Sequence, residues 1–145
     1  MKLSAFKAYV DRHADLFQGK HRETPETIAA AEAQLGVTLP ETMRWLLCDY
    51  GYSGPSGMEP LSDVIRVTRE FRINLGLPRE YIILNSWGEA GVVFMNTADG
   101  TVYWGDEGDA GELVDSEEPP DSSDMFKDYP AWVADRVQFE LEQRD

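Results

Sequence analysis

The spacing of apolar residues changes at Leu77-Pro78, and this change limits the folds that the chain can adopt. Before this point, apolar residues recur at helical spacing, which is typical of helices with one buried face. After it, short runs rich in Val, Ile, Phe and Tyr alternate with glycine turns, which is typical of β-strands. Helices, then consecutive strands, then a closing helix predict an α+β fold with a single antiparallel sheet.

Four helices are expected before the change. The first covers residues 3–17, and the second covers residues 24–36, where Thr24 can cap the first turn and Gly36 can end the last. The third covers residues 38–51. Thr38 and Glu41 are expected to form its capping box. The fourth helix is expected to be capped by Ser62. Its inward-facing residues are expected to be Val64, Val67, Phe71 and Leu75.

Three strands and a last helix are expected after the change. The sequence of turns indicates strands at 81–87, 92–97 and 101–106, with a short candidate edge strand at 112–114. Residues 124–143 are expected to form the closing helix. Its first turn would hold Pro130, and its buried face would consist of Trp132, Val133, Val137 and Leu141.

The composition predicts one folded domain over residues 1–145, since 42% of the residues are hydrophobic. The net charge of −14 is unevenly placed: residues 1–72 carry 9 basic and 10 acidic groups, whereas residues 73–145 carry 4 and 17. This distribution argues against binding to nucleic acid or to an anionic membrane, which both require clustered Lys and Arg. It permits a cationic protein partner, and the alternative is a surface that only maintains solubility.

The strongest concentration of charge is the segment Gly105–Asp124, which holds nine carboxylates and no Lys or Arg. An EF-hand loop read from Asp106 places Gly and Glu where the calcium template needs them. The third and fifth positions, however, are Gly108 and Ala110, which offer no side-chain oxygen. We therefore expect no metal here, and the scattered His and Cys residues do not form a zinc site.

No arrangement typical of an enzyme is found. His13 and His21 are flanked by charged residues and are expected to be solvated, and Cys48 is expected to be a small buried residue. Glu32 falls on the apolar face of its helix, where we expect it to accept hydrogen bonds from backbone amides or an arginine. No cofactor motif is present. The single cysteine and the charged N-terminus, which is unlike a signal peptide, predict a cytoplasmic protein.

Two stretches, "ETIAAAEAQLGVTLPETMRWLLCDYG" and "LPREYIILNSWGEAGVVFMNTADGTVYWGDEGD", resemble a known family, the SUKH superfamily (Smi/Knr-like domains). The first is similar to the family's helical signature and the second to its sheet region, so the resemblance covers residues 24–109. It implies a role in binding proteins, as bacterial immunity proteins that neutralise toxins, often nucleases, or as fungal regulators of cell-wall assembly. The positions that match the signature, with an implied scaffold role, are Glu32, Leu35, Gly36, Leu39, Pro40, Tyr50 and Gly51.

The resemblance and the charge together predict a protein-binding domain whose acidic surface meets a basic toxin. The alternative is a housekeeping adaptor of the same fold with no toxin partner. A stripe of Arg66, Arg69 and Arg72 could also pair with part of the acidic segment inside the molecule. The predicted partner-binding residues are Asp106, Glu107, Asp109, Glu112, Asp115, Glu117 and Glu118, with Trp87, Tyr103 and Trp104 as aromatic anchors.

Overall fold

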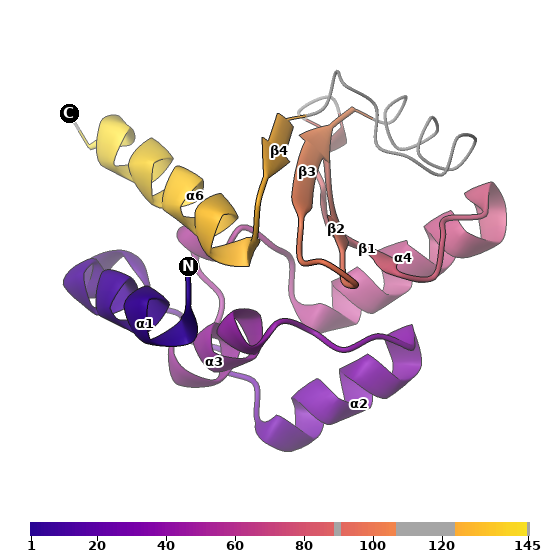
Figure 1. Ribbon diagram of the computed structural model, residues 1–145, viewed down its shortest axis with the longest axis horizontal. Helices are drawn as coiled ribbons and strands as arrows, with labels where there is room; N and C mark the ends of the chain where they lie inside the picture. The colour runs from indigo at the N-terminus through magenta and orange to yellow at the C-terminus, as the bar shows by residue number, and fades with distance from the viewer. Residues whose placement is uncertain (89–90, 107–123, 145) are drawn as a thin grey trace.

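The structure is a computed structural model that describes residues 1–88, 91–106 and 124–144 (Figure 1). In these residues, five α-helices accompany one antiparallel sheet of four strands, which confirms the predicted fold class. The helices are α1 (Leu3–Arg12), α2 (Pro25–Leu35), α3 (Glu41–Asp49), α4 (Leu61–Leu75) and α6 (Tyr129–Gln143), and the strands are β1 (Tyr81–Ser86), β2 (Val92–Asn96), β3 (Val102–Gly105) and β4 (Asp124–Phe126).

The strands follow one another in the order β1-β2-β3-β4, and α4 packs against β1 while α6 contacts β4 at the other edge (Figure 1). Helices α1, α2 and α3 gather below the sheet in this view. One face of the sheet contributes to the main core with these helices, and the other contributes to a smaller core with α4. The main core receives Ile82, Leu84, Val93, Met95 and Val102, and the smaller core receives Tyr81, Ile83, Val92 and Phe94.

The outer edge of β1 is covered by α4 and the loop before it. The backbone N–H of Ile83 donates to the Thr68 hydroxyl over 2.9 Å, and the N–H of Glu59 donates to the carbonyl of Leu84 over 2.8 Å. Thr68 is fully buried on α4. These bonds occupy backbone groups that an exposed edge strand would offer to other chains.

The loop before α4 is fixed to α6 by two buried aromatic side chains. The Tyr129 hydroxyl donates to the carbonyl of Ser56 over 2.6 Å, and the indole nitrogen of Trp132 donates to the carbonyl of Gly57 over 2.9 Å. Both rings are completely buried. Because unpaired buried carbonyls are unfavourable, these bonds tie the C-terminal helix to the first half of the chain.

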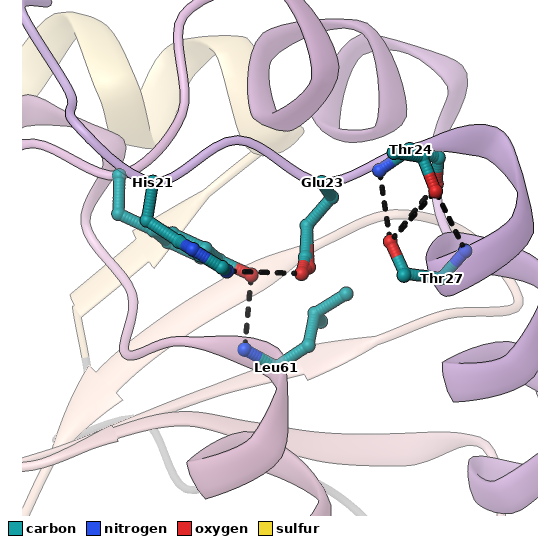
Figure 2. Close-up of polar contacts among 6 residues, drawn as sticks. His21, Glu23, Thr24, Thr27 and Leu61 are labelled. Atoms are coloured by element: carbon teal, nitrogen blue, oxygen red, sulfur yellow. Dashed lines mark hydrogen bonds and ion pairs between the residues drawn. The ribbon is translucent and has the colours of Figure 1, made fainter.

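The boundaries of α2 are as predicted, whereas two other helix starts differ. The Thr24 hydroxyl accepts a hydrogen bond from the amide of Thr27 over 3.1 Å (Figure 2), and Gly36 ends α2 with a positive φ of 70°. The capping box predicted for Thr38 and Glu41 is wrong, because α3 begins at Glu41 after Pro40, without a side-chain cap. The predicted Ser62 cap is also wrong. Helix α4 begins one residue earlier, at Leu61, directly after Pro60.

Three further expectations need correction. The first helix ends at Arg12 and is followed by a short 3-10 turn. Leu75 is 48% exposed rather than inward-facing, because the smaller core covers α4 as far as Phe71 and Leu75 is the last residue of the helix. Residues 124–126 belong to strand β4, and the last helix begins only at Tyr129, where the Asp128 carboxylate accepts from the amide of Ala131. The candidate strand at 112–114 lies outside the described residues.

Candidate protein-binding surface

Two of the predicted aromatic anchors meet at one end of the sheet. Trp87 follows β1 and Trp104 lies near the end of β3, and their rings contact edge to face at 5.5 Å. Gly91 permits this contact, because a side chain there would collide with the Trp104 indole and its φ is 117°. Two exposed carboxylates adjoin the pair: Asp124 is opposite Trp104 in the β3–β4 register, and Asp106 directly follows β3.

The third predicted anchor lies on the opposite face. Tyr103 stacks on Phe94 at 5.3 Å and belongs to the smaller core, since successive residues of a strand point to opposite faces. Tyr103 and Trp104 therefore do not form one surface. The remaining predicted acidic residues lie outside the described residues, and they are Glu107, Asp109, Glu112, Asp115, Glu117 and Glu118.

Arg136 of α6 contacts one member of the tryptophan pair, Trp104, and also Trp132. Its guanidinium lies 4.8 Å from the ring centres of both Trp104 and Trp132 and 4.9 Å from that of Phe139, and it bonds Asp135 over 2.9 Å. Such contacts combine cation–π attraction with packing. Sequence reasoning missed Arg136, although its spacing of four residues from Trp132 on a helix was a usable signal.

These contacts define the sheet-end surface, which consists of Trp87, Trp104, Asp106, Asp124 and Arg136. Both tryptophans are half-buried, so each combines packing against Trp132 with an accessible edge. Residues 107–123 connect the two strand ends that carry Asp106 and Asp124. The acidic stretch therefore starts and ends beside tryptophan and arginine side chains. Tryptophan and arginine are enriched among the residues that dominate protein–protein contacts.

The residues of the helical signature lie away from this surface and hold the helices together. The Glu32 carboxylate accepts from the amide of Leu39 over 2.7 Å, and Leu35 and Leu39 are buried. The Tyr50 hydroxyl donates to Asp11 over 2.6 Å, and Gly51 adopts a φ of 78° against the segment that contains His21. Pro40 precedes α3.

A second polar group lies between the segment that precedes α2 and the start of α4 (Figure 2). His21 stacks parallel to Tyr52 at 5.9 Å, and its Nε2 lies 3.5 Å from a Glu23 oxygen. The Tyr52 hydroxyl accepts a hydrogen bond from the amide of Leu61 over 2.9 Å. Burial is the main cause that raises the pKa of Tyr52, which keeps the phenol protonated. The group anchors the segment that precedes α2. The side chain of its histidine, His21, is 71% exposed.

Chemical groups suited to catalysis do not converge in the described part of the chain. Burial, with Asp49 and Glu23 nearby, raises the pKa of the Cys48 thiol and thereby disfavours the reactive thiolate. A cleft of about 150 Å³ between α4 and β1 is lined by Glu59, Asp63, Arg66, Val67 and Ser86. Within residues 1–88, 91–106 and 124–144, no three His, Cys, Asp or Glu side chains are placed to hold a metal ion.

None of the helices in the described residues is long and apolar enough to cross a lipid bilayer.

The described residues thus form an α+β domain with a covered sheet edge, signature residues that hold the scaffold and a charged aromatic surface. Comparison with known families agrees with the sequence resemblance. The profile of the SMI1 / KNR4 family (SUKH-1) matches residues 23–129, and the chain belongs to this family. No curated protein matches the chain. Family membership is consistent with an immunity protein or a regulator.

Proposed function

We propose that this protein is a non-enzymatic immunity protein, which neutralises a cognate toxin by binding it through the sheet-end surface and the adjoining acidic residues. The placement of Asp106 and Asp124 at neighbouring strand ends, beside Trp87 and Trp104, carries the proposal. Family membership supports a protein partner.

The expected partner is a basic toxin, with nucleases as the leading class. A nuclease must carry positive charge where it meets the phosphate backbone, so an acidic protein surface can occupy the same place. The C-terminal half of this chain supplies that charge with 17 acidic against 4 basic residues. The proposed contact residues are Asp106, Glu107, Asp109, Glu112, Asp115, Glu117 and Glu118, with Trp87 and Trp104 as anchors, whereas Tyr103 faces the smaller core and is not part of this contact.

A second candidate function is a cytoplasmic adaptor or regulator of the same fold that has no toxin partner. The family includes this role, and the same surface could serve it. The two candidates differ in what the partner does alone: a toxin arrests growth unless the immunity protein is produced with it, whereas a regulatory partner does not.

The test begins with capture of partners by the immobilised protein at low and high salt. The captured protein is then produced in cells with and without this chain. Growth arrest that the chain relieves supports the immunity role. A partner that is harmless alone would contradict it and favour the adaptor.

The surface is tested by association kinetics with the captured partner. The variant D106N/E107Q/D109N/E112Q should slow association and reduce its dependence on salt, because it removes four charges from the proposed contact. The control variant E26Q/E41Q/D49N/E142Q removes four exposed carboxylates elsewhere. If both variants associate at the same rate as the unaltered protein, the acidic contact is wrong.

A further inference from the structure

The cleft between β1 and α4, the β1–α4 cleft, has a volume of about 150 Å³ and a mixed lining. Two carboxylates, one guanidinium, one apolar side chain and one hydroxyl line it, and they belong to Glu59, Asp63, Arg66, Val67 and Ser86. A smaller adjoining hollow shares most of these residues and adds the apolar side chains of Val64, Ile83 and Leu84. Sites for drug-sized molecules typically measure about 300–1,000 Å³, so the β1–α4 cleft suits a single side chain.

The fold holds both walls of the cleft in place. On one wall, the backbone N–H of the half-buried Glu59 donates to the carbonyl of Leu84 over 2.8 Å. The other wall carries Asp63 in the first turn of α4, and further along this helix the Thr68 hydroxyl accepts from the amide of Ile83 over 2.9 Å. Because both bonds attach to β1, the two carboxylates line a preformed cleft.

Carboxylates outnumber cations at this cleft. Arg66 lies 3.4 Å from both Asp63 and Glu70, so one guanidinium is shared between two acids. No Lys, Arg or His of the described residues forms an ion pair with Glu59, and the remaining residues of the chain include none of these three types. Three carboxylates at or next to the cleft therefore accompany one arginine, and an added positive charge is favoured there.

The β1–α4 cleft lies at the same end of the sheet as the sheet-end surface. Ser86 pairs with Val92 of β2, and Val92 pairs with Gly105, the residue before Asp106. Ser86 and Gly105 are thus two strands apart, which corresponds to about 10 Å. A protein contact of ordinary size buries about 800 Å² on each partner, so one partner can cover the sheet end and reach around it to the cleft.

We propose that the β1–α4 cleft receives a basic side chain, lysine or arginine, of the protein partner. The positive group would lie between the carboxylates of Glu59 and Asp63, with the Ser86 hydroxyl as a further acceptor, and the aliphatic stem would pack on Val67. The exposed pair between Asp63 and Arg66 offers little resistance, because surface ion pairs are weak. The inference rests on the proposed function for the kind of partner, and it adds a contact outside the sheet-end surface.

Other charged occupants fit the lining less well. A phosphate group would meet the carboxylates of Glu59 and Asp63, which repel it. A metal ion needs several ligands, and in the described ranges no three His, Cys, Asp or Glu side chains are placed to hold one. A basic side chain needs only the two carboxylates and an apolar wall for its stem.

The first test is a titration of the isotope-labelled protein with Nα-acetyl-lysine amide, followed by nuclear magnetic resonance of the backbone amides. The lysine compound should shift the amides of Asp63, Val67 and Ser86. Nα-acetyl-norleucine amide should not, because it keeps the stem and lacks the charge. The variant E59Q/D63N should weaken binding of the lysine compound by roughly tenfold or more, since both carboxylates are gone. Ser86→Leu keeps both carboxylates, narrows the cleft and should also weaken binding.

The variant E26Q/E142Q is the matched control, since it removes two exposed carboxylates elsewhere and has the same net charge as E59Q/D63N. It should respond as the unaltered protein does. The inference is overturned if the lysine compound shifts no cleft amide, if norleucine shifts the same amides equally, or if the two double variants respond alike. Calcium ions that shift these amides at a lower concentration than the lysine compound would also overturn it. Thermal unfolding of each variant confirms that the fold is kept.

The second test uses the partner captured by the immobilised protein. E59Q/D63N should weaken affinity for this partner by roughly tenfold or more, and E26Q/E142Q should not. If a partner that arrests growth binds both double variants equally, the cleft contact is wrong and the immunity role stands. If a partner that is harmless alone binds E59Q/D63N more weakly than E26Q/E142Q, the immunity role is wrong and the cleft contact stands.

Discussion

The Glu32 carboxylate of α2 accepts a hydrogen bond from the backbone amide of Leu39 over 2.7 Å, across the link that leads to α3. The backbone carbonyl of Glu32 also accepts from the amides of Gly36 and Val37. One residue thus closes the helix end and fixes the extended Leu39-Pro40 segment before the next helix. This explains why a carboxylate stands on an otherwise apolar face.

Removal of this carboxylate is expected to destabilise the fold. Glu32→Ala leaves the amide of Leu39 without its partner in a partly buried position, and we expect the free energy of unfolding to fall by about 1–3 kcal/mol. Glu32→Gln keeps an acceptor and should lose less. Urea unfolding followed by circular dichroism measures both. Glu26→Ala, on the exposed side of the same helix, is the control, and an equal loss in it would contradict the role of Glu32.

Gly51 is expected to tolerate no side chain. Its φ is 78°, and a Cβ there would overlap the carbonyl oxygen of His21. Gly100 has a similar φ of 84° but open space around it. We therefore expect Gly100→Ala to cost on the order of 1 kcal/mol from backbone strain alone, and Gly51→Ala about 2–4 kcal/mol. Equal unfolding midpoints for the two variants would show that the close contact has no effect.

Local residue types were sufficient to predict the elements whose boundaries they control. Thr24 and Gly36 bound α2 because capping and a positive φ depend on the residue itself. Strand β4 could not be predicted in this way. Its three residues become a strand only by pairing with Val102–Trp104, which precede them by some twenty positions, and the only local signal was Asp128, whose carboxylate caps the helix that follows.

The candidate site could be predicted in part, where it depends on local residue pattern, but not where it depends on tertiary contacts. The alternation of a strand implies that Tyr103 and Trp104 face opposite sides, but it does not say which side Trp87 would join. The contacts of Arg136 depend on where α6 crosses the sheet, which is a tertiary property. Leu75 was misplaced because apolar periodicity does not show how far along α4 the core extends, and the smaller core covers the helix as far as Phe71.

The buried hydroxyl of Tyr129 is expected to stabilise the attachment of α6. Tyr129→Phe keeps the ring and leaves the carbonyl of Ser56 without this donor, so the free energy of unfolding should fall by about 1–3 kcal/mol. Tyr9→Phe is the control, because Tyr9 is only half-buried and its ring contacts are kept. The role assigned to the Tyr129 hydroxyl is wrong if both variants unfold at the same urea concentration.

Stability is expected to fall as the pH rises above 10, the ordinary pKa of a tyrosine. Burial is the main cause that raises the pKa of Tyr52 and of Tyr129, so the unfolded chain releases protons that the folded chain retains. The contribution of these tyrosines is therefore fully present below pH 10 and is lost as the pH rises toward their folded-state pKa values.

Urea unfolding at a series of alkaline pH values measures this loss, and Tyr129→Phe isolates one residue from the other groups that titrate there. The variant should show a shallower decline in the free energy of unfolding than the unaltered protein, because one of the phenols whose pKa is raised by burial is gone. Tyrosinate absorbance provides an independent measurement. Normal ionisation of all six tyrosines near pH 10, with a native circular dichroism spectrum, would contradict the burial of these hydroxyls.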